Sequence, residues 1–185
     1  MIKEFFHTYL KDLNQVFTSV NADGFEALID VLSRARNSGA QIFLCGNGGS
    51  ASTASHMVCD LNKGCSEGKG KRFKLICLND NIASMLAYGN DMSYEDIFVE
   101  QLKNYFNPGD LVIGISGSGN SENVIRAVQY GNDNRGVTFG LCGMGGGRLR
   151  TVAKKSLVIP SDDMQKIEDM HMIIVHCIMQ WFMSD

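Results

Sequence analysis

Residues 41–56, QIFLCGNGGSASTASH, decide the fold of this chain. A short apolar run ends at Cys45, a glycine-rich turn follows, and a helical pattern continues from about residue 51. A buried strand that leads through such a turn into a helix is typical of an α/β unit, and the free N–H groups at the helix start favour an anion. The turn also matches the GxGxxG/A pattern of dinucleotide-binding proteins. That match is weak, because the acid expected about 20 residues later is missing and the first acid after the second apolar run is Asp80.

The same alternation of apolar runs and helical patterns continues through the chain. Short continuous apolar runs are typical of strands that are buried on both faces of a sheet. We therefore predict an α/β fold with a five-stranded, parallel, doubly wound sheet in the flavodoxin-like order 2-1-3-4-5 and right-handed crossovers. The predicted strands cover residues 41–45, 73–78, 111–115, 137–142 and 157–159, and the helices residues 51–63, 81–88, 94–105, 121–134, 148–154 and 163–183.

Two further helices precede the alternating part of the chain. Apolar residues recur at helical spacing over residues 2–20 and again over residues 24–38. No linker or repeat divides the chain, so we expect residues 1–185 to form a single domain whose α/β core is residues 39–185. Extra helices of this kind often pack against a partner chain, and we expect residues 1–38 to serve oligomer packing.

The composition excludes several classes of protein. Of the 185 residues, 44% are apolar and 20% are charged, which argues against disorder. The net charge is −3 and the basic residues are scattered, so no nucleic-acid partner is expected. We expect no membrane association and a cytoplasmic location, because no apolar stretch approaches about 18 residues and the N-terminus is too charged for a secretory signal. The six cysteines lack CxxC spacing and are predicted to be buried thiols, apart from an exposed Cys65.

A second polar, glycine-rich loop follows the third apolar run. Its sequence is GISGSGNSEN, and Ser116, Ser118 and Ser121 crowd three hydroxyls around two glycines. Asn47 and Ser50 supply polar side chains to the first loop. Strands 1 and 3 are neighbours at the switch point of the predicted sheet, so both loops should face one crevice. Hydroxyls and amides in that setting favour a phosphate group, and the alternative is a pair of ordinary tight turns with a capping serine.

Two pairs of residues could carry chemistry. His56 and Asp60 lie four residues apart and share a helix face. Glu168 and His176 lie eight residues apart, a rotation of about 80°, so both can project toward one cleft. The four side chains suit zinc or another divalent ion, or an acid and a base for proton transfer. The alternative is a buried histidine and a solvated glutamate, and His171 is about 140° from His176, too far round the helix to join the group.

Asn90 and Asp91 form a third candidate. They follow a short predicted helix in the stretch AYGNDMSYED. They could be an ordinary capped turn, or they could bring an amide and a carboxylate to sugar hydroxyls. His7, in the first predicted helix, is expected to face solvent.

Four motifs, in this order, resemble those of the bacterial phosphoheptose isomerases. These enzymes are the sedoheptulose 7-phosphate isomerases of the sugar isomerase (SIS) domain superfamily. The motifs are GNGGSAxxAxH from residue 46, YGND from residue 88, ISxSGNSxNV from residue 115, and PSDD from residue 160 with IExxH and a further histidine after it. The resemblance covers nearly the whole chain. It implies a homotetramer with active sites shared between subunits, often with zinc, that acts on an open-chain seven-carbon ketose phosphate.

The resemblance also implies roles for individual residues. For substrate and phosphate binding it implies Asn47, Gly48, Gly49, Ser50, Asn90, Asp91, Ser116, Gly117, Ser118, Ser121 and Glu168. For metal binding it implies His56, Asp60, Glu168 and His176, and for catalysis Asp60, Glu168 and His176.

Three positions depart from the family pattern. Asp60 stands where the family usually has the glutamate that is metal ligand and catalytic base, and its carboxylate is about one bond length shorter. Glu168 replaces a glutamine, which adds a negative charge that should strengthen metal binding and could supply a base. Gly117 replaces a threonine of the phosphate loop.

The expected activity is conversion of sedoheptulose 7-phosphate to D-glycero-D-manno-heptose 7-phosphate for surface polysaccharide. Asp60 or Glu168 would move the proton between C1 and C2, and His176 would handle the oxygen protons. One alternative is a non-catalytic tetrameric SIS protein that binds a replication initiator or senses sugar phosphates. Another is an isomerase of a different sugar phosphate.

Overall fold

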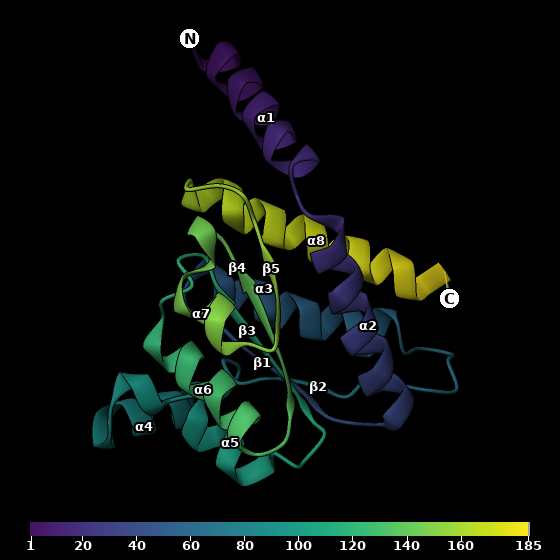
Figure 1. The fold of residues 1–185 in the computed structure, drawn as a ribbon, viewed down its shortest axis with the longest axis vertical. Helices are drawn as coiled ribbons and strands as arrows, with labels where there is room; N and C mark the ends of the chain where they lie inside the picture. Colours follow the sequence, from purple (N-terminus) through teal and green to yellow (C-terminus); the bar gives the residue numbers. More distant parts are fainter. Residues whose placement is uncertain (185) are drawn as a thin grey trace.

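A parallel sheet forms the centre of the molecule in a computed structural model that describes residues 1–184 (Figure 1). Its strands pair in the order β2-β1-β3-β4-β5, and all four pairings are parallel. The order and the α/β class that the apolar runs predict are therefore confirmed. The strands are β1 (Ile42–Cys45), β2 (Leu75–Cys77), β3 (Leu111–Ser116), β4 (Val137–Cys142) and β5 (Lys155–Val158).

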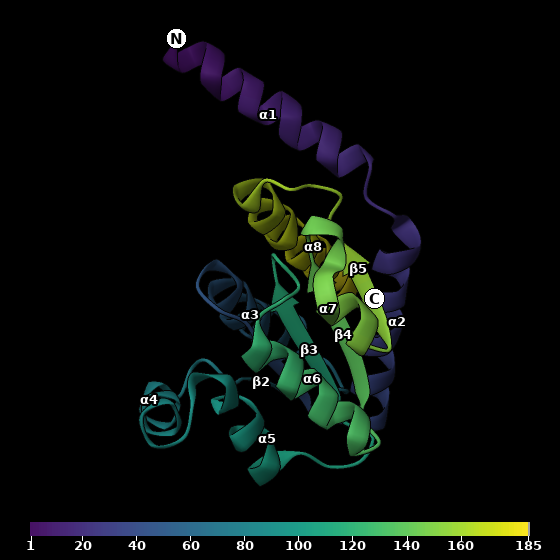
Figure 2. The same ribbon diagram turned by 60° about the vertical axis from the view of Figure 1, so that its left-hand side comes forward.

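Helices cover both faces of the sheet (Figure 2). One apolar cluster joins the sheet to α2, α3 and α8, and a second joins the opposite face to α5, α6 and α7. Every residue of β3 is buried, as expected for a central strand with helices on both sides. The helices are α1 (Ile2–Thr18), α2 (Ala22–Ser38), α3 (Gly49–Cys59), α4 (Ile82–Asp91), α5 (Val99–Tyr105), α6 (Glu122–Asp133), α7 (Gly147–Val152) and α8 (Met164–Ser184), with the short turns η1 (Asp60–Gly64), η2 (Tyr94–Asp96) and η3 (Met144–Gly146).

Helix boundaries differ from the predicted ones at two functionally relevant places. α3 begins at Gly49, because Gly48 takes a φ of 54° that lets the chain turn directly from β1 into the helix. Residues 94–105, predicted as one helix, form the 3₁₀ turn η2 and then α5.

Helix α1 projects away from the body of the molecule in both views (Figures 1 and 2). It contains no buried residue, and several of its apolar side chains are exposed. It contacts the end of the core through Tyr9, whose hydroxyl donates to Asp169 Oδ2 at 2.6 Å. This bond raises the pKa of Tyr9 to about 12. The assignment of residues 1–38 to oligomer packing stays a prediction.

The cysteines are all free, but two expectations about their burial are wrong. Cys65 is buried and not exposed, because η1 tucks its thiol against the carbonyl of Met179 at 3.5 Å. Cys59 and Cys177 are exposed, since they lie on the outward faces of α3 and α8. No helix among residues 1–184 is long and apolar enough to cross a membrane.

Candidate functional site

The first glycine-rich loop connects β1 to α3 at the carboxyl edge of the sheet. Asn79, just beyond the end of the neighbouring strand β2, braces it with two hydrogen bonds. The amide of Asn79 donates to the carbonyl of Gly46 at 2.8 Å, and the N–H of Gly46 donates to Asn79 Oδ1 at 3.2 Å. The loop is thereby fixed at the carboxyl ends of the neighbouring strands β1 and β2, where its backbone can approach a ligand closely.

The two polar loops lie together, as their sheet positions predict. Asn47 of the first loop and Asn123, in the first turn of α6 after the second loop, exchange two hydrogen bonds of 2.9 Å. The hydroxyl of Tyr94 in η2 donates to Asn47 Oδ1, also at 2.9 Å. A continuous network therefore joins the first loop, η2 and the start of α6, which follows the second loop.

The second loop gathers three hydroxyl groups. Ser116 Oγ lies 3.1 Å from Ser121 Oγ and 3.5 Å from Ser118 Oγ. Ser121 occupies the N-cap position of α6 but makes no capping bond, so its hydroxyl faces the other serines. Across residues 1–184, no described hydrogen bond joins a lysine or arginine side chain to these hydroxyls. The loop can bind a dianion through hydroxyls and the N–H groups of a helix start.

Gly117 lies between these serines without room for a side chain. A Cβ atom at Gly117 would overlap the sulfur of Met164, in the first turn of α8. The space beside the loop is thus filled by a thioether. The family resemblance implies a threonine at this position, and in this chain Met164 occupies the space beside the glycine that replaces it.

His56, Asp60 and His176 form a group that could hold a metal ion. Their ligand atoms all lie within 4.8 Å of one another. His56 Nε2 lies 3.1 Å from His176 Nε2 and 3.2 Å from Asp60 Oδ2. Asp60 Oδ2 is buried and makes no hydrogen bond of ordinary geometry. Two imidazole nitrogens and a carboxylate oxygen that converge on one point are a donor set that divalent ions take.

The relative position of α3 and α8 creates this group. The two helices run side by side in the same direction, with Glu168 against Gly49, His176 against His56, and Met179 against Gly64. Helix α3 passes directly into the π-helical turn η1 at Asp60, a feature that is frequent at functional sites.

Glu168 lies apart from the group of three. Its carboxylate packs on Gly49 in the first turn of α3, where a Cβ atom would overlap it. This position is favourable for a negative charge, because the N-terminus of a helix carries a partial positive charge. Of the four predicted ligands the structure therefore brings three together, and Glu168 as a fourth ligand stays a prediction.

Asn90 and Asp91 are not joined to the loops by any described hydrogen bond among residues 1–184. They are exposed and are the last two residues of α4, whereas the sequence pattern placed them just after the helix. The amide of Asn90 donates to Asp91 Oδ1 at 2.8 Å, so the two side chains bond to each other. Their contact with sugar stays a prediction.

His171 and His7 lie outside the group, as expected. His171 is fully buried on the inner face of α8, and burial lowers its pKa to about 4. His7 is exposed on α1.

Sequence reasoning assigned no role to Asn123 or Tyr94. Asn123 belongs to the NSxNV part of the third motif, so its position next to a functional loop was a usable signal. Tyr94 had no such signal, because only the fold brings η2 to the first loop.

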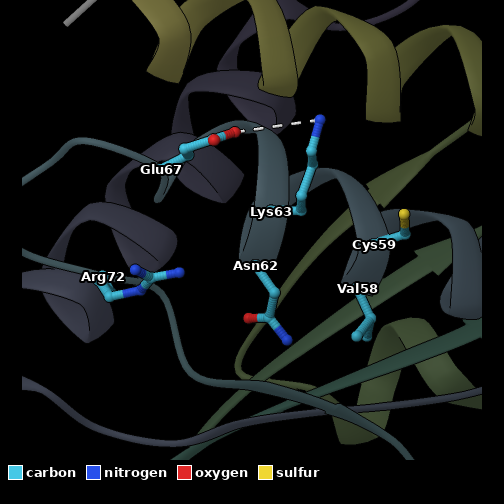
Figure 3. A pocket seen from close by; sticks show the side chains of 6 residues that line it. All are labelled: Val58, Cys59, Asn62, Lys63, Glu67 and Arg72. Atoms are coloured by element: carbon cyan, nitrogen blue, oxygen red, sulfur yellow. Dashed lines mark ion pairs between the residues drawn. The ribbon is translucent and has the colours of Figure 1, made fainter.

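A pocket of about 540 Å³ opens beside the end of α3 (Figure 3). An ion pair of 4.0 Å between Lys63 and Glu67 spans part of its rim. The lining of the pocket includes neither His56 nor Asp60, so the pocket is separate from the group of possible metal ligands. The lining residues are Val58, Cys59, Asn62, Lys63, Glu67 and Arg72.

Comparison with known proteins places these features in a family. Residues 4–143 match the model of the SIS domain. The phosphoheptose isomerase of Helicobacter hepaticus is 33% identical over 178 residues, which are 96% of this chain and 89% of that protein. The phosphoheptose isomerase of Aliarcobacter butzleri is 39% identical over 142 residues, 77% of this chain and 75% of that protein.

Solved structures show the same fold. The phosphoheptose isomerase of Neisseria gonorrhoeae superposes with a TM-score of 0.91 and covers 100% of both chains at 22% identity. The phosphoheptose isomerase of Francisella tularensis superposes with a TM-score of 0.89 at 24% identity, over 100% of this chain and 97% of that one. At such identities the likeness concerns the fold alone.

Proposed function

Because the chain belongs to the phosphoheptose isomerases of the SIS domain family, we propose that it converts sedoheptulose 7-phosphate to D-glycero-D-manno-heptose 7-phosphate. The product would enter heptose synthesis for surface polysaccharide. One observation carries the proposal: the chain combines a phosphate-type serine loop after β3 with a convergent His/Asp/His group on α3, η1 and α8, and α3 begins at the neighbouring first loop. The two features suit the two ends of a sugar phosphate.

The phosphate end of the substrate belongs in the second loop. Ser116, Ser118 and Ser121 offer hydroxyls that are within 3.5 Å of one another, and α6 begins directly after them. The first loop, with Gly48 and Gly49, adds the N-terminus of α3 from the neighbouring strand. Two helix starts and three hydroxyls offset the charge of a dianion without a basic side chain.

The donor set at the other end fits zinc. The two histidine nitrogens lie 3.1 Å apart and Asp60 Oδ2 is buried without a hydrogen bond, so two nitrogens and one oxygen of the kinds that bind zinc lie close together. His56, Asp60 and His176 would hold the ion, with Glu168 as the further candidate ligand. A divalent ion at this place would polarise the substrate carbonyl and stabilise the developing charge.

Two side chains divide the proton transfers. Isomerisation needs one base that moves a proton between C1 and C2 and one group that handles the protons of O1 and O2. Asp60 directs its buried oxygen at the imidazoles, whereas the carboxylate of Glu168 stands outside the group beside the first loop. Glu168 is thus the better placed base, and His176 serves the oxygens.

The assembly that we propose is a homotetramer in the cytoplasm with active sites shared between subunits. Support comes from α1, which has no buried residue and exposes Phe5, Phe6 and Leu10. The six free cysteines suit a reducing compartment.

The deciding experiment is NMR of the purified protein with sedoheptulose 7-phosphate, with and without added zinc. New anomeric signals of the aldose are expected, and they should need the metal. Glu168→Gln should lower the rate at least about 100-fold while metal content is kept. Asp60→Asn should lose both rate and bound metal, measured by elemental analysis.

Asp133→Asn is the matched control, because Asp133 ends α6 on the surface and should leave the rate unchanged. A zinc-loaded protein that forms no aldose would overturn the proposed activity. Full activity of Glu168→Gln would instead assign the base to Asp60. A monomer in light scattering would refute the tetramer.

A further inference from the structure

We infer that Tyr94 and Asn123 are positioning residues that lock the amide of Asn47, so that Asn47 meets the substrate only as a hydrogen-bond donor. The inference rests on the proposed function and deepens it. The three residues come from three separate places: the first loop, η2 and α6. Nothing in their spacing along the chain relates them.

The backbone of α6 fixes the direction of the network. The N–H of Val124 can only donate, and it donates to Asn123 Oδ1 at 2.9 Å. This bond identifies the oxygen of the Asn123 amide. The atom of Asn47 that also faces this oxygen must therefore be its nitrogen, and it donates at 2.9 Å. Conversely, Asn123 Nδ2 donates to Asn47 Oδ1 at 2.9 Å.

Tyr94 completes the network. Its hydroxyl lies 2.9 Å from Asn47 Oδ1 and must donate to it. A carbonyl oxygen has two lone pairs, and those of Asn47 are then both occupied, one by Asn123 and one by Tyr94. What Asn47 has left is the second hydrogen of its Nδ2. Its partner in a complex must be an acceptor, such as a phosphate, carbonyl or hydroxyl oxygen of the sugar phosphate.

Contacts with α6 hold Tyr94 in place although its side chain is 58% exposed. Asp96, two residues later, accepts from Ser93 Oγ and from Arg126 Nη1, both at 2.7 Å. These two bonds lower the pKa of Asp96, so its charge is kept. The segment that carries Tyr94 is thereby tied to the same helix that carries Asn123.

A double-mutant cycle tests the inference. Tyr94→Phe removes only the hydroxyl and should lower kcat/KM about tenfold, the loss expected for one hydrogen bond at a site. In an Asn47→Ala background the same change should cost less than about twofold, because its target is gone. Tyr105→Phe is the matched control: this phenol is 54% exposed and lies outside the network. It should leave kcat/KM unchanged, and both tyrosine variants should keep the melting temperature of their parent protein.

A second test uses NMR and does not depend on enzymatic activity. In ¹⁵N-labelled protein the Asn47 side-chain hydrogen that bonds to Asn123 should exchange slowly with solvent, and the second hydrogen should exchange faster. Tyr94→Phe should shift this signal, and Tyr105→Phe should not. An unshifted signal, or an equal loss of kcat/KM in both backgrounds, would overturn the inference. Absence of isomerase activity in the wild type would overturn the proposed function, whereas the amide signal alone decides whether the network exists.

Discussion

Acidification from about pH 7.5 to pH 5 should remove about 2 kcal/mol of stability through a single residue, His171. This side chain is 0% exposed, and neither ring nitrogen makes a hydrogen bond of ordinary geometry. Burial lowers its pKa from 6.5 to about 4, and the backbone of Cys142 offsets only part of that effect. The unfolded chain therefore binds a proton at a pH where the folded chain does not.

The sign and size follow from these two values. The contribution is fully present above pH 6.5, and it is lost as the pH falls through 6.5 toward about 4. A difference of about 2.5 between the folded and unfolded pKa corresponds to about 3 kcal/mol once both states are protonated. At pH 5 the unfolded chain is almost fully protonated, so about 2 kcal/mol of this is already lost.

Urea unfolding of the metal-free protein at both pH values is the measurement. His171→Leu is the comparison, because leucine fills similar space and does not titrate. Every other ionisable group is the same in both proteins, so the difference between the two isolates His171. We expect the variant to lose about 2 kcal/mol less than the wild type between the two pH values. An equal loss in both proteins would refute the argument that His171 is buried in its neutral form.

Three further changes test the packing around the site. Gly49→Ala would place a Cβ atom where the carboxylate of Glu168 lies. It should displace this carboxylate and lower kcat/KM by about 10- to 100-fold in a steady-state assay. Gly119→Ala should cost about 1–3 kcal/mol in urea unfolding, because Gly119 has a φ of 67° and its Cβ atom would overlap the backbone carbonyl of Gly146. In a thiol-labelling assay the exposed Cys59 and Cys177 should react within minutes and the other four cysteines only after denaturation. Unchanged kcat/KM, unchanged stability or fast labelling of more than two thiols would each contradict the structure.

The family motifs and the helix periodicity were enough to select the candidate residues, but not to group them. His56 and Asp60 share a helix face by spacing alone, and the structure holds them 3.2 Å apart. His176 joins them, whereas Glu168, on the same helix, does not. The difference depends on how far α8 is shifted along α3. Contacts such as Glu168 on Gly49 determine that shift, and no periodicity encodes it.

The sequence by itself determined the order of strands and helices, the parallel sheet and the two polar loops at its switch point. These features depend on local patterns: apolar runs of strand length, helical spacing and glycines at turns. Only the tertiary structure decided that Asn47 bonds to Asn123 and Tyr94, and that Cys65 is buried under α8. The physical reason is that such contacts join residues far apart in the chain, and the packing of helices on the sheet, set by many side chains together, fixes their separation.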